Sequence, residues 1–174
     1  MAAIRTRRWL SALVGLIIVL IALVVLFIYS GFYDVSARYK DPASVAWLLS
    51  KTMDSSVKKH AADIKAPPLD DPAMVKAGAQ DYREDCVMCH GAPGVRIGEV
   101  GRGLNPDPPE LTEAAGDWKP REFFWITKNG VRMTGMPAWG VTHSDKELWA
   151  ITAFAQKLPK MSHAEYEALT RETP

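Results

Sequence analysis

The sequence has 174 residues and carries 21 lysines and arginines against 20 acidic residues. This length allows one ordinary domain beside a membrane segment. The balanced charge excludes the overall basic character of a nucleic-acid-binding protein, so no nucleic-acid partner is expected.

The N-terminal residues predict a membrane anchor at residues 1–33. Three arginines near the start precede a stretch from Trp9 to Tyr33 that contains no charged side chain. About 25 helical residues span about 37 Å, which is enough to cross a bilayer. A cleaved signal peptide is the alternative, but its apolar region is typically only about 7–15 residues long. We therefore favour an uncleaved anchor whose arginines stay in the cytoplasm while the remainder is translocated.

Residues 34–69 contain a second predicted helix. Asp41 can cap this helix and Pro42 suits its first position. Apolar residues then recur with helical spacing at Val45, Leu48, Leu49, Met53 and Val57. Such an amphipathic helix can lie on a membrane surface, dock on a partner subunit or pack on its own domain. Two consecutive prolines, Pro67 and Pro68, then favour a short extended linker.

The motif Cys86-Val87-Met88-Cys89-His90 carries most of the functional information. Two cysteines at this spacing followed by histidine are the attachment signature of c-type haem, in which the thiols form thioethers and the imidazole binds the iron. A structural zinc site would need four ligands, but the chain has only these two cysteines and its other histidines are far apart. A redox dithiol would be expected beside a βαβ pattern, which is not found. The motif therefore predicts one covalently attached haem c.

Further helices are predicted around this motif. They are a helix from Pro72 towards Cys86, a helix over Pro120–Asn129 ended by Gly130, a helix behind the Ser144–Glu147 capping box and a short helix after Ser162. Between Gly91 and Trp118 the chain is rich in glycine and proline and shows no strand alternation. The predicted fold class is therefore all-α with long loops.

This order of elements resembles class I cytochromes c over about residues 70–160. The resemblance rests on the helix before Cys-x-x-Cys-His, a Pro-x-Leu element, a middle helix, a Gly-Met-Pro turn and a C-terminal helix. It implies helices around one covalent haem in a domain at 70–174, preceded by a single transmembrane helix. In this family the first and last helices cross, so Gly78 and Tyr82 would meet Trp149 or Phe154.

The resemblance also implies the site residues on the proximal side of the haem. Cys86 and Cys89 would hold the haem and His90 would ligate the iron. The Pro-x-Leu element maps to Pro109 and Leu111, and the Pro109 carbonyl would orient the His90 imidazole. The neighbouring Pro108 and the nearer Pro93 are alternative carbonyl donors.

The sixth iron ligand implied by the resemblance is Met136 of the Gly135-Met136-Pro137 turn. Gly135 gives the backbone freedom to approach the haem, and Pro137 stiffens the turn. Met133 and His143 are alternatives, although His143 directly precedes the Ser144 cap, where a solvent-facing residue is ordinary.

These features predict a carrier of electrons and not an enzyme. Histidine and methionine ligation raises the reduction potential and leaves dioxygen no free coordination position. We expect a carrier tethered to the bacterial inner membrane with its haem domain in the periplasm. Its partners would be redox proteins or respiratory-complex subunits in or on that membrane. The alternative is a haem enzyme or gas-sensing subunit with an open or labile sixth site.

Overall fold

The computed structural model describes residues 2–171, and the chain divides into two compact units between Tyr39 and Lys40. All regular secondary structure in these described residues is helical, apart from one isolated bridge between Ala92 and Val95. The all-α prediction is therefore confirmed.

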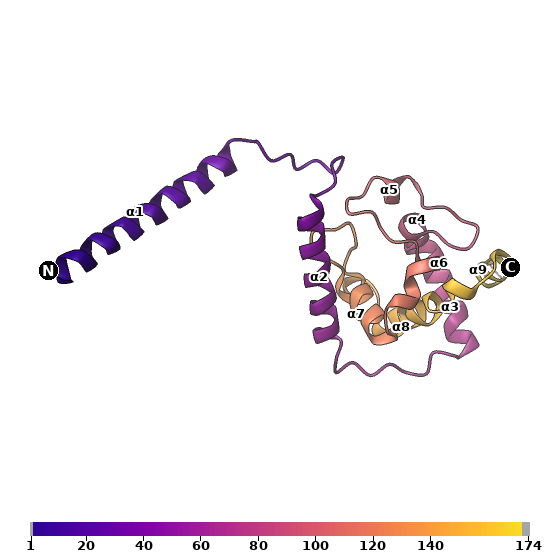
Figure 1. Ribbon diagram of the computed structural model, residues 1–174. Helices are drawn as coiled ribbons and strands as arrows, with labels where there is room; N and C mark the ends of the chain where they lie inside the picture. The colour runs from indigo at the N-terminus through magenta and orange to yellow at the C-terminus, as the bar shows by residue number, and fades with distance from the viewer. Residues whose placement is uncertain (1, 172–174) are drawn as a thin grey trace. The chain divides into compact units, whose positions relative to one another are not determined.

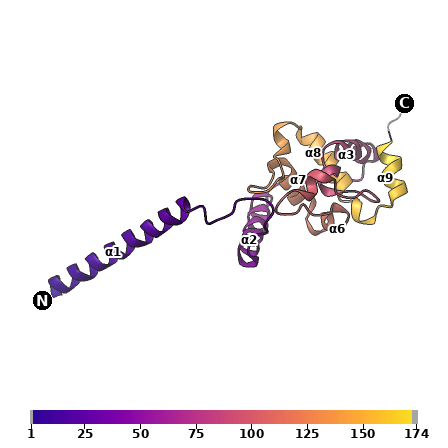
Figure 2. The ribbon, with the colours of Figure 1, turned by 90° about the horizontal axis from the view of Figure 1, so that it is seen from above.

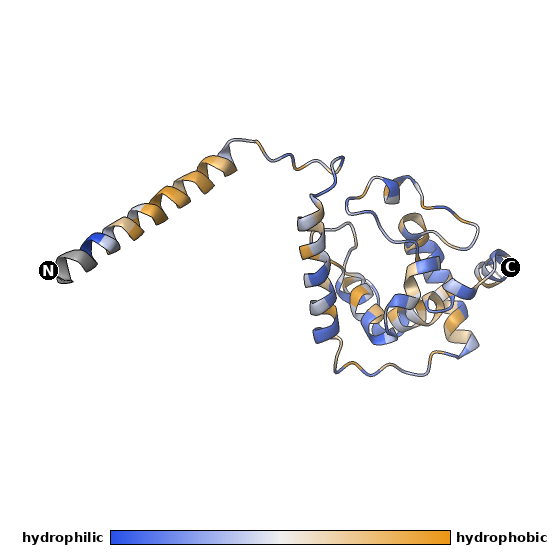
Figure 3. Cartoon of the chain, in the orientation of Figure 1, coloured by the Kyte–Doolittle hydropathy of each residue, from blue (hydrophilic) through white to orange (hydrophobic). Residues whose placement is uncertain are grey.

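The first unit contains a single long helix, α1 (Ala2–Tyr29). Its segment Arg7–Tyr29 is long and apolar enough to cross a membrane. Figure 3 shows this segment as a nearly continuous hydrophobic stretch, and its large apolar side chains are exposed. An exposed helix that is apolar on every side is typical of a membrane-spanning segment. The helix therefore supports the predicted membrane anchor.

The second unit consists of helices joined by long loops (Figure 1). The helices are α2 (Ala43–His60), α3 (Pro72–Asp85), α4 (Val87–His90), α5 (Glu99–Arg102), α6 (Leu111–Ala114), α7 (Pro120–Asn129), α8 (Asp145–Ala155) and α9 (His163–Thr170). Short 3-10 turns lie at Ala115–Asp117, Trp139–Val141 and Leu158–Lys160.

Local caps explain where several of these helices begin. The Asp71 side chain accepts a hydrogen bond from the backbone N–H of Ala73 at the start of α3. Ser144 at α8 and Ser162 at α9 each form the predicted capping box with a glutamate three residues later. These caps satisfy backbone N–H groups that a helix start otherwise leaves without partners.

Helices α3 and α8 pack against each other at the centre of the domain (Figures 1 and 2). A Cβ atom at Gly78 would overlap the backbone carbonyl of Ala150, so the two backbones approach as closely as glycine allows. One turn further along α3, the Tyr82 ring lies 5.2 Å from the Phe154 ring, centroid to centroid. Of the two predicted aromatic partners, Phe154 is the one observed, whereas Trp149 stacks on Phe124 at 4.0 Å.

Helix α2 divides into two halves that differ in their surroundings. In the second half Val57 is buried, as is Ala61 just beyond the helix. His60 stacks on Trp125 of α7 with ring centroids 5.6 Å apart. Of the three predicted roles for α2, packing on its own domain is therefore observed for this half. The helix begins at Ala43, one residue later than predicted, with Pro42 as its cap residue.

Candidate haem site

The Cys-x-x-Cys-His motif forms one helical turn that continues from α3. The backbone N–H of Cys86 donates to the Tyr82 carbonyl at 2.9 Å, and the N–H of His90 donates to the Cys86 carbonyl at 2.9 Å. Cys86 is buried and Cys89 is partly exposed, and neither forms a disulfide. Because residues three apart lie on the same side of a helix, both sulfur atoms belong to one face of this turn.

The ring of His90 is held by a loop far along the chain. Its Nδ1 atom lies 2.8 Å from the carbonyl oxygen of Pro109. A carbonyl oxygen only accepts, so Nδ1 carries the proton and Nε2 is left with its lone pair. Burial lowers the pKa of His90, against the opposing effect of the Pro109 hydrogen bond. The arrangement therefore favours a neutral imidazole whose Nε2 can bind a metal.

Of the two alternative carbonyls, those of Pro108 and Pro93, that of Pro93 accepts a hydrogen bond from another residue. It accepts from Nδ1 of His163 on α9 at 2.7 Å. Leu111, two residues after Pro109, is buried at the start of α6 and belongs to the main hydrophobic cluster. Leu111 thus anchors the loop that carries the Pro109 carbonyl.

The pKa values of the two thiols differ from those of reactive redox cysteines. Burial and the nearby carboxylate of Asp85 raise the pKa of Cys86 to about 12, and burial also raises the pKa of Cys89. Reactive redox cysteines, by contrast, are thiolates, which form where neighbouring groups lower the pKa. The described residues contain no group of three or more histidine, cysteine or acidic side chains placed to hold a metal ion.

Tyr82 is a functional position whose role sequence reasoning missed. The Tyr82 hydroxyl, fully buried, donates to the carbonyl of Gly91 at 2.7 Å. Gly91 directly follows His90 and has a φ of 64°, a conformation that favours glycine. The hydrogen bond fixes the chain where it leaves the motif. The sequence placed Tyr82 at the helix crossing, but the partner of its hydroxyl depends on the path of the loop.

The chain then folds back over the outer side of the motif. The N–H of Gly98 donates to the Met88 carbonyl at 3.0 Å. A Cβ at Gly101 of α5 would lie 2.9 Å from Cα of Cys89, which is too close for any other residue without a shift. This return loop, residues 91–104, therefore packs against Met88 and Cys89 of the motif.

Met136 lies in a compact turn that is stabilised by its own hydrogen bonds. The Met136 N–H donates to Oγ1 of Thr134 at 3.0 Å, and that hydroxyl donates to the Val131 carbonyl at 2.8 Å. Met136 is half-buried, whereas Met133 is largely exposed. A Cβ at Gly135 would lie 2.6 Å from the Leu104 side chain, so the Met136 turn packs against the end of the return loop.

Comparison with known families decides what this arrangement is. Residues 73–154 match the family model described as cytochrome c oxidase, cbb3-type, subunit III. The domain is a class I c-type cytochrome. A comparison with curated proteins returned no match. The matched residues extend from α3 to the end of α8, so they include the motif, the Pro109 loop and the Met136 turn.

The residues of the cytochrome domain fit a covalently attached haem. Two thiols share one face of a helical turn, and the tautomer of the adjacent imidazole leaves Nε2 to bind iron. Cytochromes of this type transfer electrons through such a group, so the chain carries a haem-based electron-transfer domain.

His143 in the cytochrome domain does not face solvent as expected. Its Nε2 lies 3.1 Å from Oδ2 of Asp85, and its side chain is only 17% exposed. Its Nδ1 lies 2.9 Å from Oγ1 of Thr142. The sequence could not show this pairing because Asp85 belongs to α3, far away along the chain. The pair joins the end of α3, just before Cys86, to the segment that follows the Met136 turn.

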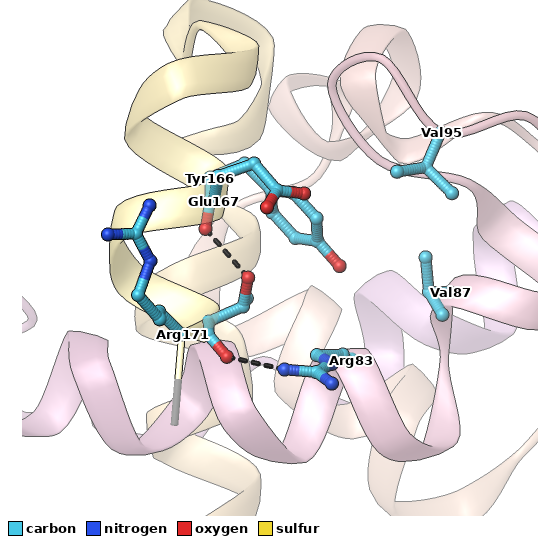
Figure 4. Close-up of a pocket in the computed structure, with 7 residues that line it drawn as sticks. Arg83, Val87, Val95, Tyr166, Glu167 and Arg171 are labelled. Atoms are coloured by element: carbon cyan, nitrogen blue, oxygen red, sulfur yellow. Dashed lines mark hydrogen bonds between the residues drawn. The ribbon is translucent and has the colours of Figure 1, made fainter. Parts of the chain in front are cut away.

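An open pocket of about 620 Å³ lies between α3 and α9, next to Val87 of the motif (Figure 4). Arg83 extends across it and donates from Nη1 to the Thr170 carbonyl at 2.6 Å. The Thr170 hydroxyl donates in turn to the Tyr166 carbonyl at 2.9 Å. These hydrogen bonds between α3 and α9 and within α9 hold α9 on the cytochrome domain, and the pocket lies beside them.

Proposed function

We propose that this chain is a membrane-tethered periplasmic one-electron carrier with a single haem c ligated by His90 and Met136. It serves or belongs to a respiratory electron-transfer complex. The observation that carries the proposal is the 2.8 Å contact between Nδ1 of His90 and the Pro109 carbonyl. It supports Nε2 as the atom that binds the iron, because metal-binding histidines commonly have a fixed acceptor at the second ring nitrogen.

The haem supplies a one-electron Fe(III)/Fe(II) couple when it is bound. Cys86 and Cys89 hold it covalently, and Leu111 supports the loop that orients His90. Met136 offers a soft, neutral thioether, which favours the reduced iron and raises the potential. His90 and Met136 would both bind the iron, which would leave dioxygen no position there. The chain then acts as a carrier and not as an enzyme.

The proposed organisation has three parts. Residues 1–33 form the cytoplasmic end and the anchor, residues 34–69 connect it, and residues 70–174 form the monohaem domain. The arginines before the apolar span favour a cytoplasmic N-terminus and an exported domain. The family match to an oxidase subunit supports partners in the same membrane.

Carbon monoxide binding tests the carrier function against the enzyme and sensor alternative. The reduced, haem-loaded protein should not bind carbon monoxide at neutral pH, because His90 and Met136 would both be bound to the iron. A denaturing gel stained for haem should show that the haem remains attached, and this staining should be lost in a Cys86→Ser, Cys89→Ser variant. Stoichiometric carbon monoxide binding by the folded protein would instead support an open sixth site.

A further inference from the structure

The first two turns of α2 are left without any cover by the domain on which the helix packs. Residues 42–50 are all exposed, whereas Val57 and Ala61 are buried. The exposed part contains four large apolar side chains that are 40–63% exposed: Val45, Trp47, Leu48 and Leu49. No charged residue occurs between Pro42 and Ser50. A helix end that is both uncharged and unpacked exposes apolar area that normally needs a partner.

The distribution of these side chains indicates which partner covers them. Val45, Leu48 and Leu49 share one side of the helix, because they are spaced by three and four residues. Trp47 lies two residues, or about 200°, from Val45 and so points to the opposite side. A groove on a protein covers one face of a helix. A fluid lipid interface surrounds the helix end and can cover both sides.

The chain before α2 has a composition that is typical of protein segments at a membrane–water interface. Only residues 30–42 separate α1 from α2, and they span at most about 45 Å when fully extended. Phe32, Tyr33 and Tyr39 are exposed in this connection. Aromatic side chains of this kind, and tryptophan above all, are enriched where bilayers meet water. The same composition continues into α2 with Trp47.

Charge attraction contributes little to this surface. The connection carries two acidic and two basic residues, Asp34, Arg38, Lys40 and Asp41. Lys40 pairs with Asp107 of the domain. A polybasic patch, which would bind anionic lipids, is therefore not present in this segment.

We propose that residues 43–50 of α2 insert into the headgroup region of the membrane that the anchor crosses. The inference rests on the proposed membrane tether. Because the second half of the same helix packs on the cytochrome domain, the inserted end sets the height and tilt of the domain at the membrane surface. The ligand of this surface is the lipid interface itself, whether or not its lipids are anionic.

Spin labels on α2 test this insertion in the full-length, haem-loaded chain. Leu48→Cys receives a nitroxide, and Lys59→Cys, exposed in the second half of α2, serves as the matched control. The native cysteines are blocked by their thioethers. In vesicles of pure phosphatidylcholine, the label at 48 should collide several-fold more with oxygen than with a water-soluble nickel chelate. The label at 59 should show the reverse preference.

Three results would overturn the inference, and each differs from failure of the tether. If the labels at 48 and 59 both collide more with the nickel chelate than with oxygen while the protein sediments with the vesicles, residue 48 lies in water. Protection at 48 only in native membranes would assign the surface to a protein partner. A requirement for anionic lipid would assign it to charge attraction. Loss of the protein from the vesicles would instead contradict the proposed tether.

Discussion

A single hydrogen bond from the Tyr82 hydroxyl stabilises the segment that carries the Cys-x-x-Cys-His motif. The hydroxyl is buried, and it donates to the carbonyl of Gly91, which directly follows the proposed iron ligand His90. Desolvation raises the pKa of Tyr82 well above its usual value, so the phenol remains a proton donor throughout the physiological range. One side chain thus links the helix crossing to the turn that follows His90.

Tyr82→Phe should destabilise the haem-loaded protein by about 1–2 kcal/mol, because the Gly91 carbonyl loses its donor inside the core. Urea unfolding, monitored through the visible absorption of the haem, measures this loss of stability. Tyr166→Phe, whose hydroxyl lies at the open pocket in Figure 4, should cost less than about 0.5 kcal/mol. Equal losses in the two variants would remove the special role given to Tyr82.

At the scale of elements, the crossing of α3 and α8 fixes the position of the motif. Gly78 allows the backbone approach, and the Tyr82 and Phe154 rings pack one turn away. Because α4 continues from α3 with a helical hydrogen-bond pattern, any shift at the crossing would move Cys86 and His90.

Gly78→Ala should therefore destabilise the domain by about 1–3 kcal/mol, since the added methyl group overlaps the Ala150 carbonyl. Thermal unfolding of the haem-loaded variant and of the haem-loaded native protein measures this difference in stability. Gly116→Ala is the matched control, because there a Cβ meets only the Pro159 ring at 3.9 Å. That variant should be neutral or slightly more stable. An unchanged Gly78→Ala protein would mean that the helices are not packed as described.

The sequence predicts those helices whose ends are set by capping or helix-breaking residues at the ends themselves. The bounds of α7 follow from Pro120 at its first position and Gly130 at its end. The Ser144 and Ser162 capping boxes set the starts of α8 and α9. By contrast, α5 and α6 have only four residues each, and α5 is held by packing on α4. Helices this short have no periodic pattern that a sequence could reveal.

The candidate site divides in the same way between local and long-range causes. The spacing of Cys86, Cys89 and His90 lies within one helical turn, so the sequence displays it directly. The choice among three prolines as acceptor for His90 depends on how a loop returns across the molecule, and only the structure places the Pro109 carbonyl there. The pairing of His143 with Asp85 has the same cause.

For the whole molecule, an apolar helix and a cytochrome domain belong to two compact units on one chain. The proposed tether would keep the haem near partners in the membrane, so that weak transient docking would be sufficient for electron transfer. This benefit requires that the domain and its redox partners face the same side of the membrane.

The proposed topology predicts that protease added to spheroplasts digests the cytochrome domain, because the domain lies outside the inner membrane. Inverted membrane vesicles should protect it. Immunoblotting against the domain provides the readout, with a cytoplasmic protein as the control for intact membranes. Protection in spheroplasts together with digestion in inverted vesicles would reverse the assigned orientation.

The carrier function depends above all on Met136 as the proposed sixth ligand of the haem iron. Oxidised cytochromes c in which methionine sulfur coordinates the iron have a weak charge-transfer band at the red end of the visible spectrum. The band should be present in the native protein and in Met133→Ala, whose side chain is exposed in the same loop. It should be absent in Met136→Ala, with the covalent haem retained. A band that survives in Met136→Ala, or that the native protein lacks, would contradict the assignment.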